Sequence, residues 1–476
     1  MSAEKLIGKK AYAVLFFAVV ALALFAYTYK VVGIAPSYDD GVYAYSLLSP
    51  MHLKTTSLFG SAIGFFVYGY PFTRLLGHIM IIPTLMTLSA IALTILIIFL
   101  ICNEYRNRLA GIIASALYAF NPLVFAYSNR LLPDIFTTML LALSILLFLK
   151  AKKSSKWYLF FISGSVVFAG IFFGYQVLFV SLIYLVFAAS SFAFGKMGGV
   201  AKSLALSIAG MLIMVTAWLL YQQYLYSTPF FLVTAATRIY SLTGMLAWSM
   251  SFYPVMVFPM HIIPSIVGGS YEPYVNVGIL GYAFLLVSMF LFTKYGRKYR
   301  KHVLPYAIAS LAFILFLMYG SQSLTAYSHI YAENRFLMPF VLLASLGSAI
   351  AIGSMKARRA IALSATLLVL YAVFFIAMYP SVINFYNSQD ALLNYLQSTL
   401  PYQNMSAYRI YQNVFSISDA FCYLFDASPP NCTDNSLAAV PSGICEQNKT
   451  AIFSNAEICN QSTAFGYPST YIHIRD

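Results

Sequence analysis

Apolar stretches long enough to cross a lipid bilayer recur along this chain, and they constrain its fold more than any other feature. A bilayer core about 30 Å thick is crossed by about 20 apolar residues of helix, and residues 11–30 already meet that requirement. Because lipid offers the backbone no hydrogen-bond partners, such stretches have to be helical. The sequence therefore predicts an α-class membrane domain.

About eleven stretches of roughly 17 or more mainly apolar residues qualify as transmembrane helices. They are residues 11–30, 79–101, 109–127, 133–149, 157–173, 175–194, 204–224, 275–293, 303–320, 336–353 and 360–380. The composition agrees, since only 9% of the residues are charged, against about a quarter in soluble domains. We predict a polytopic membrane protein whose first stretch is an anchor and not a cleaved signal peptide.

Lysine and arginine residues indicate which side of the membrane each loop faces. Most of the 28 basic residues lie in short segments that share one side with the N-terminus. These segments are residues 5–10, 106–108, 150–156, 196–202, 294–301 and 356–359. Cytoplasmic loops carry an excess of Lys and Arg, so we predict a cytoplasmic N-terminus and an exported C-terminus. The net charge of +14 then belongs to these loops and gives no reason to expect a nucleic-acid partner.

The long connecting segments face the outer side in this topology. They are residues 31–78, 225–274 and 321–335, together with the tail from 381. Residues 225–274 are apolar but interrupted by proline and glycine, so we expect interfacial helices there. The tail has four cysteines and four N-x-S/T sequons, a pattern typical of an oxidising, glycan-bearing compartment. We predict a transmembrane domain over 1–380 and a small exported α/β domain over 381–476, which begins with a surface helix at 386–400 and is disulfide-bonded in an undetermined pattern.

Charged residues near the predicted outer boundary are the candidate functional groups, because ionisable side chains at membrane depth are costly and usually functional. They are Asp39, Asp40, Lys54, Arg74, Arg130, Asp134, Arg238, His329, Glu333 and Arg335. Several also suit purely structural roles. Asp39 and Asp40 suit a solvated turn, Asp134 suits the first turn of a helix, and Arg130 and Arg335 could extend to lipid headgroups.

Paired carboxylates beside several cations suit the transfer of a sugar from a lipid phosphate. A carboxylate can accept the proton of an attacking hydroxyl, and Arg or Lys can stabilise the departing phosphate. A donor with a long isoprenoid tail has to be bound from the bilayer, which explains a reaction site among many helices. Two other functions stay open: a transporter or flippase of lipid-linked sugars, and a non-catalytic scaffold whose exported tail is the functional part.

Three segments resemble motifs of the GT-C superfamily of membrane glycosyltransferases. SYDDGVYAYS at 37–46 resembles its acidic first-loop motif. SNRLLPDIF at 128–136 resembles the arginine-to-aspartate entry into the fourth helix, and ENRFLMPF at 333–340 resembles a late Arg-Tyr/Phe-Leu-x-Pro segment. The similarity is to the branch of protein O-mannosyltransferases and lipid A aminoarabinose transferases, and it extends to the order and topology of the whole membrane part.

The resemblance implies an inverting transfer of a sugar from a polyprenyl (dolichyl) phosphate to an acceptor hydroxyl on the outer face. Asp39 would be the general base, with Asp40 in the place that relatives usually fill with Glu. Arg130 and Arg335 would contact the donor phosphate, and Asp134 would orient the site or the acceptor.

The other charged candidates are assigned with less detail. Lys54 and Arg74 are further candidates for the donor phosphate, and either His78 or Arg74 would take the place of an arginine that opens the second helix in relatives. Arg238, His329 and Glu333 are possible lining residues. Relatives in the oligosaccharyltransferase branch use a divalent metal, but this chain has no Asp-x-Asp motif, so we predict no cofactor, with a divalent metal as the alternative.

The partners and location follow from the same resemblance. We expect a polyprenyl-phosphate sugar as donor and a protein, lipid or glycan as acceptor. The protein is expected to span a plasma membrane or endomembrane several times, with its active site and its C-terminal domain on the extracytoplasmic side.

Overall fold

The structure, a computed structural model, falls into two units. It describes residues 9–28, 43, 47, 62–76, 81–105, 107–192, 198–230, 300–319, 334–355, 358–369, 372–373, 376, 437–441, 456–462 and 469–474. The first unit comprises Met1–Tyr27, Leu88–Ser128 and Pro133–Tyr379, and the second comprises Thr28–Thr87, Asn129–Leu132 and Pro380–Asp476. The predicted transmembrane domain supplies the first unit and part of the second.

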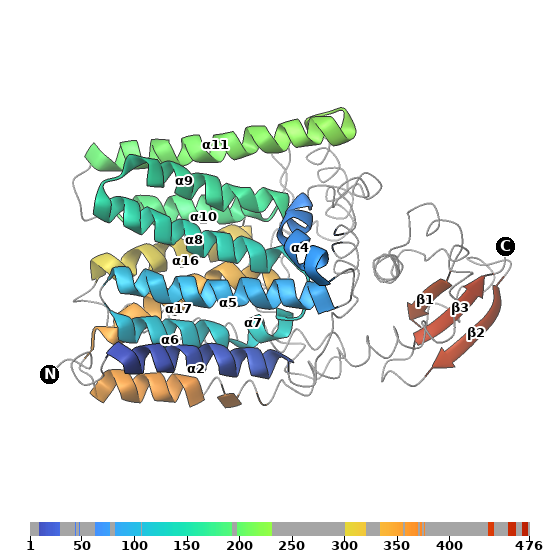
Figure 1. Ribbon diagram of the computed structural model, residues 1–476, viewed down its shortest axis with the longest axis horizontal. Coiled ribbons are helices and arrows are strands. Elements are labelled where there is room, and N and C mark those ends of the chain that lie inside the picture. Colours follow the sequence, from blue (N-terminus) through green and yellow to red (C-terminus); the bar gives the residue numbers. More distant parts are fainter. Residues whose placement is uncertain are drawn as a thin grey trace. The chain divides into compact units, whose positions relative to one another are not determined.

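The first unit is a helical bundle whose long helices lie side by side (Figure 1). Its elements are α2 (Lys9–Thr28), most of α5 (Ile81–Glu104), α6 (Arg108–Ala119), α7 (Pro122–Tyr127), α8 (Pro133–Ser154), α9 (Trp157–Phe168), η2 (Ala169–Phe172), α10 (Val177–Ser190), α11 (Gly198–Tyr226), α16 (Arg300–Tyr319), η4 (Asn334–Leu337) and α17 (Met338–Gly353). Within the described residues, five helices are long and apolar enough to cross a membrane, and shorter apolar helices accompany them. The predicted α-helical membrane class is therefore confirmed, while the count of eleven spans and their topology stay predictions.

Two predicted spans are broken in the structure. The stretch at 109–127 divides into α6 and α7, because Pro122 lacks an N–H group to continue the first helix. Instead Pro122 begins α7, and the Asn121 side chain accepts a hydrogen bond of 2.9 Å from the Leu123 N–H as its cap. The stretch at 157–173 changes from α-helix to the short 3-10 helix η2 at Ala169. The prediction of two uninterrupted spans was wrong at these points.

The second unit contains a helix that the sequence analysis assigned to a loop. Within the predicted outer loop 31–78, α4 runs from Ile63 to Leu76 with Pro71 inside it. Its buried side holds Phe65, whose ring lies 4.6 Å from that of Tyr43. The loop prediction was therefore wrong for this segment, where a partly buried helix continues through Pro71.

Three strands of the tail form an antiparallel sheet. They are β1 (Leu437–Pro441), β2 (Ala456–Ser462) and β3 (Ser469–Ile474), in the order β1-β3-β2. Tyr471 of the central strand lies opposite Ala439 and Asn460. The predicted surface helix at 386–400 lies outside the described residues, so the α/β domain and its disulfide bonds stay predictions.

Glycines bring α9 and α11 of the first unit into close contact. A Cβ atom at Gly164 would lie 1.9 Å from the Ser207 carbonyl oxygen, and one at Gly210 would lie 2.0 Å from the Phe161 carbonyl oxygen. The Tyr184 hydroxyl of α10 lies 3.1 Å from the Ser207 hydroxyl and joins the contact. Small residues with interhelical hydrogen bonds are how helices associate in lipid, where hydrophobic burial gives little drive.

The glycine contact gives a stability prediction. Gly164→Ala should lower the melting temperature of the detergent-solubilised protein, because overpacking typically costs about 1–3 kcal/mol. Gly199→Ala is the matched control, since a Cβ there meets nothing within 4 Å, and it should be neutral or slightly stabilising. Equal melting temperatures for the two variants would show that the α9–α11 contact tolerates the extra atom.

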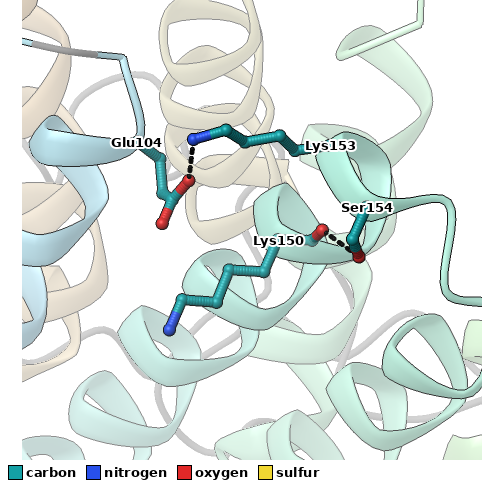
Figure 2. A network of polar contacts seen from close by, with 4 residues as sticks. All are labelled: Glu104, Lys150, Lys153 and Ser154. Carbon is teal, nitrogen blue, oxygen red and sulfur yellow. Dashed lines mark hydrogen bonds and ion pairs between the residues drawn. The ribbon is translucent and has the colours of Figure 1, made fainter.

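The helix ends with basic residues meet at one end of the first unit. Glu104 at the end of α5 pairs with Lys153 at the end of α8, with 3.0 Å between Oε2 and Nζ (Figure 2). Lys152 donates a 2.5 Å hydrogen bond to the carbonyl of Ser191, just after α10. Helix ends that the sequence assigns to the cytoplasm thus share one end of the bundle, as the predicted orientation requires, although the membrane face itself stays a prediction.

Candidate active site

Asp134 and Arg335 form a buried ion pair in the first unit. The Arg335 Nε lies 3.8 Å from the Asp134 Oδ2, and the two side chains are 10% and 2% exposed. Asp134 is in the first turn of α8 and Arg335 is in η4, directly before α17. Two candidates that lie far apart in the sequence are therefore brought together by the fold.

The local sequence explains how Asp134 is held. Pro133 begins α8, where its missing N–H costs nothing, and a carboxylate in the first turn is favoured by the helix dipole. The Thr137 hydroxyl donates to the carbonyls of Pro133 at 3.0 Å and Asp134 at 3.2 Å. The Thr137 hydrogen bonds to the backbone and the position of the Asp134 carboxylate in the helix dipole thus both stabilise the start of α8.

Packing between helices positions Arg335. Helix α17 packs against α8, and η4 contacts α7, which begins after the break at Asn121 and Pro122. The guanidinium also lies over the Phe336 ring, 5.4 Å from its centroid. A planar guanidinium stacked on an aromatic ring loses little freedom on binding an anion.

The burial of this pair has an energetic consequence. Removing a carboxylate from water costs several kcal/mol, and a nearby cation repays that cost only while both partners are present. Stability alone does not explain the pair, since well-packed apolar residues at these positions would often stabilise the fold as much. A buried charged pair that stability does not explain is a candidate for function.

Two further candidates lie in the second unit. Arg130 is 8% exposed, and its carbonyl accepts a 2.9 Å hydrogen bond from the Leu132 N–H, which turns the chain ahead of α8. Arg74 is exposed in the last turn of α4, where a cation is favoured by the helix dipole. Burial distinguishes Arg130 from Arg74, although the role of each stays a prediction.

The remaining predicted site residues lie outside the described residues. They are Asp39, Asp40, Lys54, Arg238, His329 and Glu333. Among the residues that the structure describes, no cluster of three His, Cys, Asp or Glu side chains could hold a metal ion. The general base and the absence of a metal therefore stay predictions.

The structure adds two buried amides that the sequence analysis missed. Gln176 is 6% exposed and lies close to the start of α8, since an added Cβ on Gly174 would meet both Gln176 and Pro133 within 2.9 Å. Gln222 on α11 is fully buried, and its amide has no hydrogen-bond partner among the described residues. In the sequence, Gln176 and Gln222 could have been recognised as amides within otherwise apolar stretches.

Comparisons with known proteins support the superfamily resemblance. A family model described as dolichyl-phosphate-mannose-protein mannosyltransferase matches residues 71–221. This range includes Arg130 and Asp134. A search of curated proteins found no significant match.

Solved structures with a similar fold include proteins from Cupriavidus metallidurans and Archaeoglobus fulgidus. The structure of ArnT from Cupriavidus metallidurans bound to undecaprenyl phosphate matches with a TM-score of 0.60 and 12% identity, over 98% of each chain. The archaeal oligosaccharyltransferase AglB from Archaeoglobus fulgidus, in complex with an inhibitory peptide and a dolichol-phosphate, matches with a TM-score of 0.50 and 11% identity, over 92% of this chain and 71% of that one. An oligosaccharyltransferase structure from the same archaeon, tethered to an acceptor peptide containing the NVT sequon, matches with a TM-score of 0.52 and 11% identity. The match covers 98% of this chain and 74% of that one.

The fold is thus similar to the folds of ArnT and of the archaeal oligosaccharyltransferase. Together with the match to the mannosyltransferase family model, this similarity confirms the predicted resemblance.

Proposed function

We propose that this protein is an integral-membrane inverting glycosyltransferase. It moves a sugar from a polyprenyl (dolichyl) phosphate to an acceptor hydroxyl on the extracytoplasmic face. The observation that carries the proposal is the buried Asp134–Arg335 pair. It lies in a fold shared with proteins whose structures contain undecaprenyl phosphate and a dolichol-phosphate.

Arg335 binds the donor phosphate in this proposal, and Asp134 holds the guanidinium for it. A guanidinium has five N–H donors in a rigid plane, so it can contact phosphate oxygens while its Nε faces the Asp134 carboxylate. The negative charge on the phosphate grows as the sugar leaves, and a cation fixed in a water-poor site stabilises that charge best. The pair therefore orients a phosphate-binding group before the donor arrives.

The chemical step needs a base and a leaving group on opposite sides of the sugar. The acceptor hydroxyl attacks the anomeric carbon and its proton passes to the Asp39 carboxylate. The bond between the anomeric carbon and the phosphate oxygen breaks, and polyprenyl phosphate leaves as an anion. A single displacement of this kind inverts the anomeric configuration.

The other charged candidates take supporting roles. Asp40 is the alternative base, and Arg130, Lys54 and Arg74 are further cations for the donor phosphate. Arg238, His329 and Glu333 are proposed to line the site. No metal or other cofactor takes part in the proposed reaction.

A protein acceptor fits the comparisons best. The matching family model is named for protein mannosylation, and the archaeal oligosaccharyltransferase was solved with a tethered acceptor peptide. We therefore propose an exported protein segment as acceptor, with a lipid or a glycan as the alternatives.

A panel of donors and acceptors tests the proposed reaction class. Purified protein in nanodiscs is incubated with radiolabelled polyprenyl-phosphate sugars, together with a peptide, a lipid or a glycan acceptor. We expect one donor to be consumed, with label appearing in the peptide. Movement of intact lipid-linked sugar across a vesicle membrane, without transfer to any acceptor, would contradict the proposal and favour a flippase.

A further inference from the structure

Basic residues from two helices lie at the basic end of the first unit. Lys152 lies at the end of α8, and Lys301 and His302 lie in the first turn of α16; both helices pack against α10. Burial, followed by the charges of Lys301 and Lys152, lowers the pKa of the His302 imidazole, so the two lysines carry the positive charge at neutral pH. We call these three residues the basic cluster.

Contacts with its neighbours hold the basic cluster in place. The Lys152 Nζ donates to the Ser191 carbonyl at 2.5 Å and lies 4.8 Å from the centroid of the Phe192 ring. The His302 ring lies 4.9 Å from that of Tyr105. Lys152 is therefore anchored just after the end of α10, and the His302 ring lies against Tyr105 just after the end of α5.

Little negative charge offsets the basic cluster. Within the described residues of the first unit, Glu104 and Asp134 are the acidic residues. Glu104 is engaged by Lys153, and Figure 2 shows the Lys150 side chain extending away from that pair. The first turn of α16 carries no acidic residue, although a helix N-terminus favours an anion. An anion bound from outside the protein would relieve the electrostatic repulsion between Lys152 and Lys301.

The face of α16 that carries Lys301 continues as an apolar surface. Ile308, Leu311 and Leu315 are 36%, 46% and 46% exposed, and Lys301 is exposed as well. Their spacing of seven, three and four residues places all four on one face of the helix. An amphiphile with a charged head and an aliphatic chain matches this face, whereas a free anion would leave the apolar part unused.

We propose that the basic cluster binds the phosphate of an anionic membrane lipid, whose acyl chain lies along the Lys301–Leu315 face of α16. Basic pockets between helix ends are suited to such headgroups, and each Lys or Arg near the surface contributes about 1 kcal/mol. The site lies at the end of the bundle that carries the basic residues, and its occupation does not depend on the proposed transfer reaction.

Lipid binding to charge variants tests this site. The cluster variant is Lys152→Gln with Lys301→Gln. The control is Lys156→Gln with Lys202→Gln, which removes the same charge from two other exposed lysines. Phosphatidylglycerol and phosphatidylcholine are titrated onto each detergent-solubilised protein, and bound lipid is counted by native mass spectrometry. We expect phosphatidylglycerol to bind the cluster variant about 30-fold more weakly than wild type, with little change in the control.

Each other outcome would overturn the proposal. Equal weakening in both variants would show attraction to overall charge without a site, and equal binding of both lipids would remove the role of the phosphate. Inorganic phosphate that competes as strongly as the lipid would identify a site for the free anion. A Lys152→Arg, Lys301→Arg variant keeps the charge and should bind normally, so its loss of binding would also count against the proposal.

Discussion

Replacing Asp39 with asparagine should reduce sugar transfer by about 100- to 10,000-fold, the usual contribution of a general base. Asparagine has nearly the same size but does not accept the proton of the attacking hydroxyl. Expression and melting temperature should stay at the wild-type level, because the change is nearly isosteric. Initial rates with a saturating polyprenyl-phosphate donor measure the effect.

Asp40→Asn is the matched control for that substitution, since it changes the neighbouring carboxylate in the same way. We expect a smaller loss of turnover, because the resemblance assigns the base to Asp39. A larger loss in Asp40→Asn would transfer the role of base to Asp40. Full activity in both variants would contradict an enzyme that uses either carboxylate.

Removing Arg335 should strongly destabilise the protein. Arg335→Met leaves the Asp134 carboxylate buried at 2% exposure without this cation, and loss of one partner from a buried pair typically costs about 3–5 kcal/mol. A second substitution, Asp134→Asn, removes the stranded charge and should recover much of that stability. Melting temperatures of the two single variants and the double variant measure the coupling.

The same variants separate stability from phosphate binding. If Arg335 binds the donor phosphate, the double variant should regain stability but should still transfer sugar far more slowly than wild type. Arg335→Lys keeps the charge without the planar donor array, so it should be intermediate in transfer. Recovery of both stability and transfer in the double variant would show that the pair is structural.

Local signals in the sequence predicted much of the bundle and part of the site. Proline at the first position and a carboxylate in the first turn predicted the start of α8 at Pro133, as the structure shows. The apolar stretches placed the long helices, because lipid leaves the backbone no alternative to internal hydrogen bonds.

Features that depend on competing local effects were not predictable. The stretch at 109–127 reads as one span by hydrophobicity, yet Asn121 and Pro122 end one helix and begin another. Residues 63–76 were assigned to a loop, yet they form α4, which continues through Pro71 and buries Phe65. The helix ends before Pro122 but continues through Pro71, so a proline alone does not predict where a helix ends.

The contact between Asp134 and Arg335 also needed the fold. The sequence placed both residues at the same predicted membrane boundary, but only the packing of α17 against α8 brings their charges to 3.8 Å. Gln176 was missed because a single amide in an apolar stretch does not indicate which neighbours it will meet. Its proximity to the start of α8 depends on the turn through Gly174.

The most direct measurement of the proposed reaction uses a donor labelled in both the sugar and the polyprenyl phosphate. With wild-type protein in proteoliposomes, we predict that each sugar transferred to a peptide releases one polyprenyl phosphate, and that both products form only when the acceptor is present. Sugar and lipid phosphate that cross the membrane still joined, with no labelled peptide, would contradict a glycosyltransferase and identify a carrier of lipid-linked sugars.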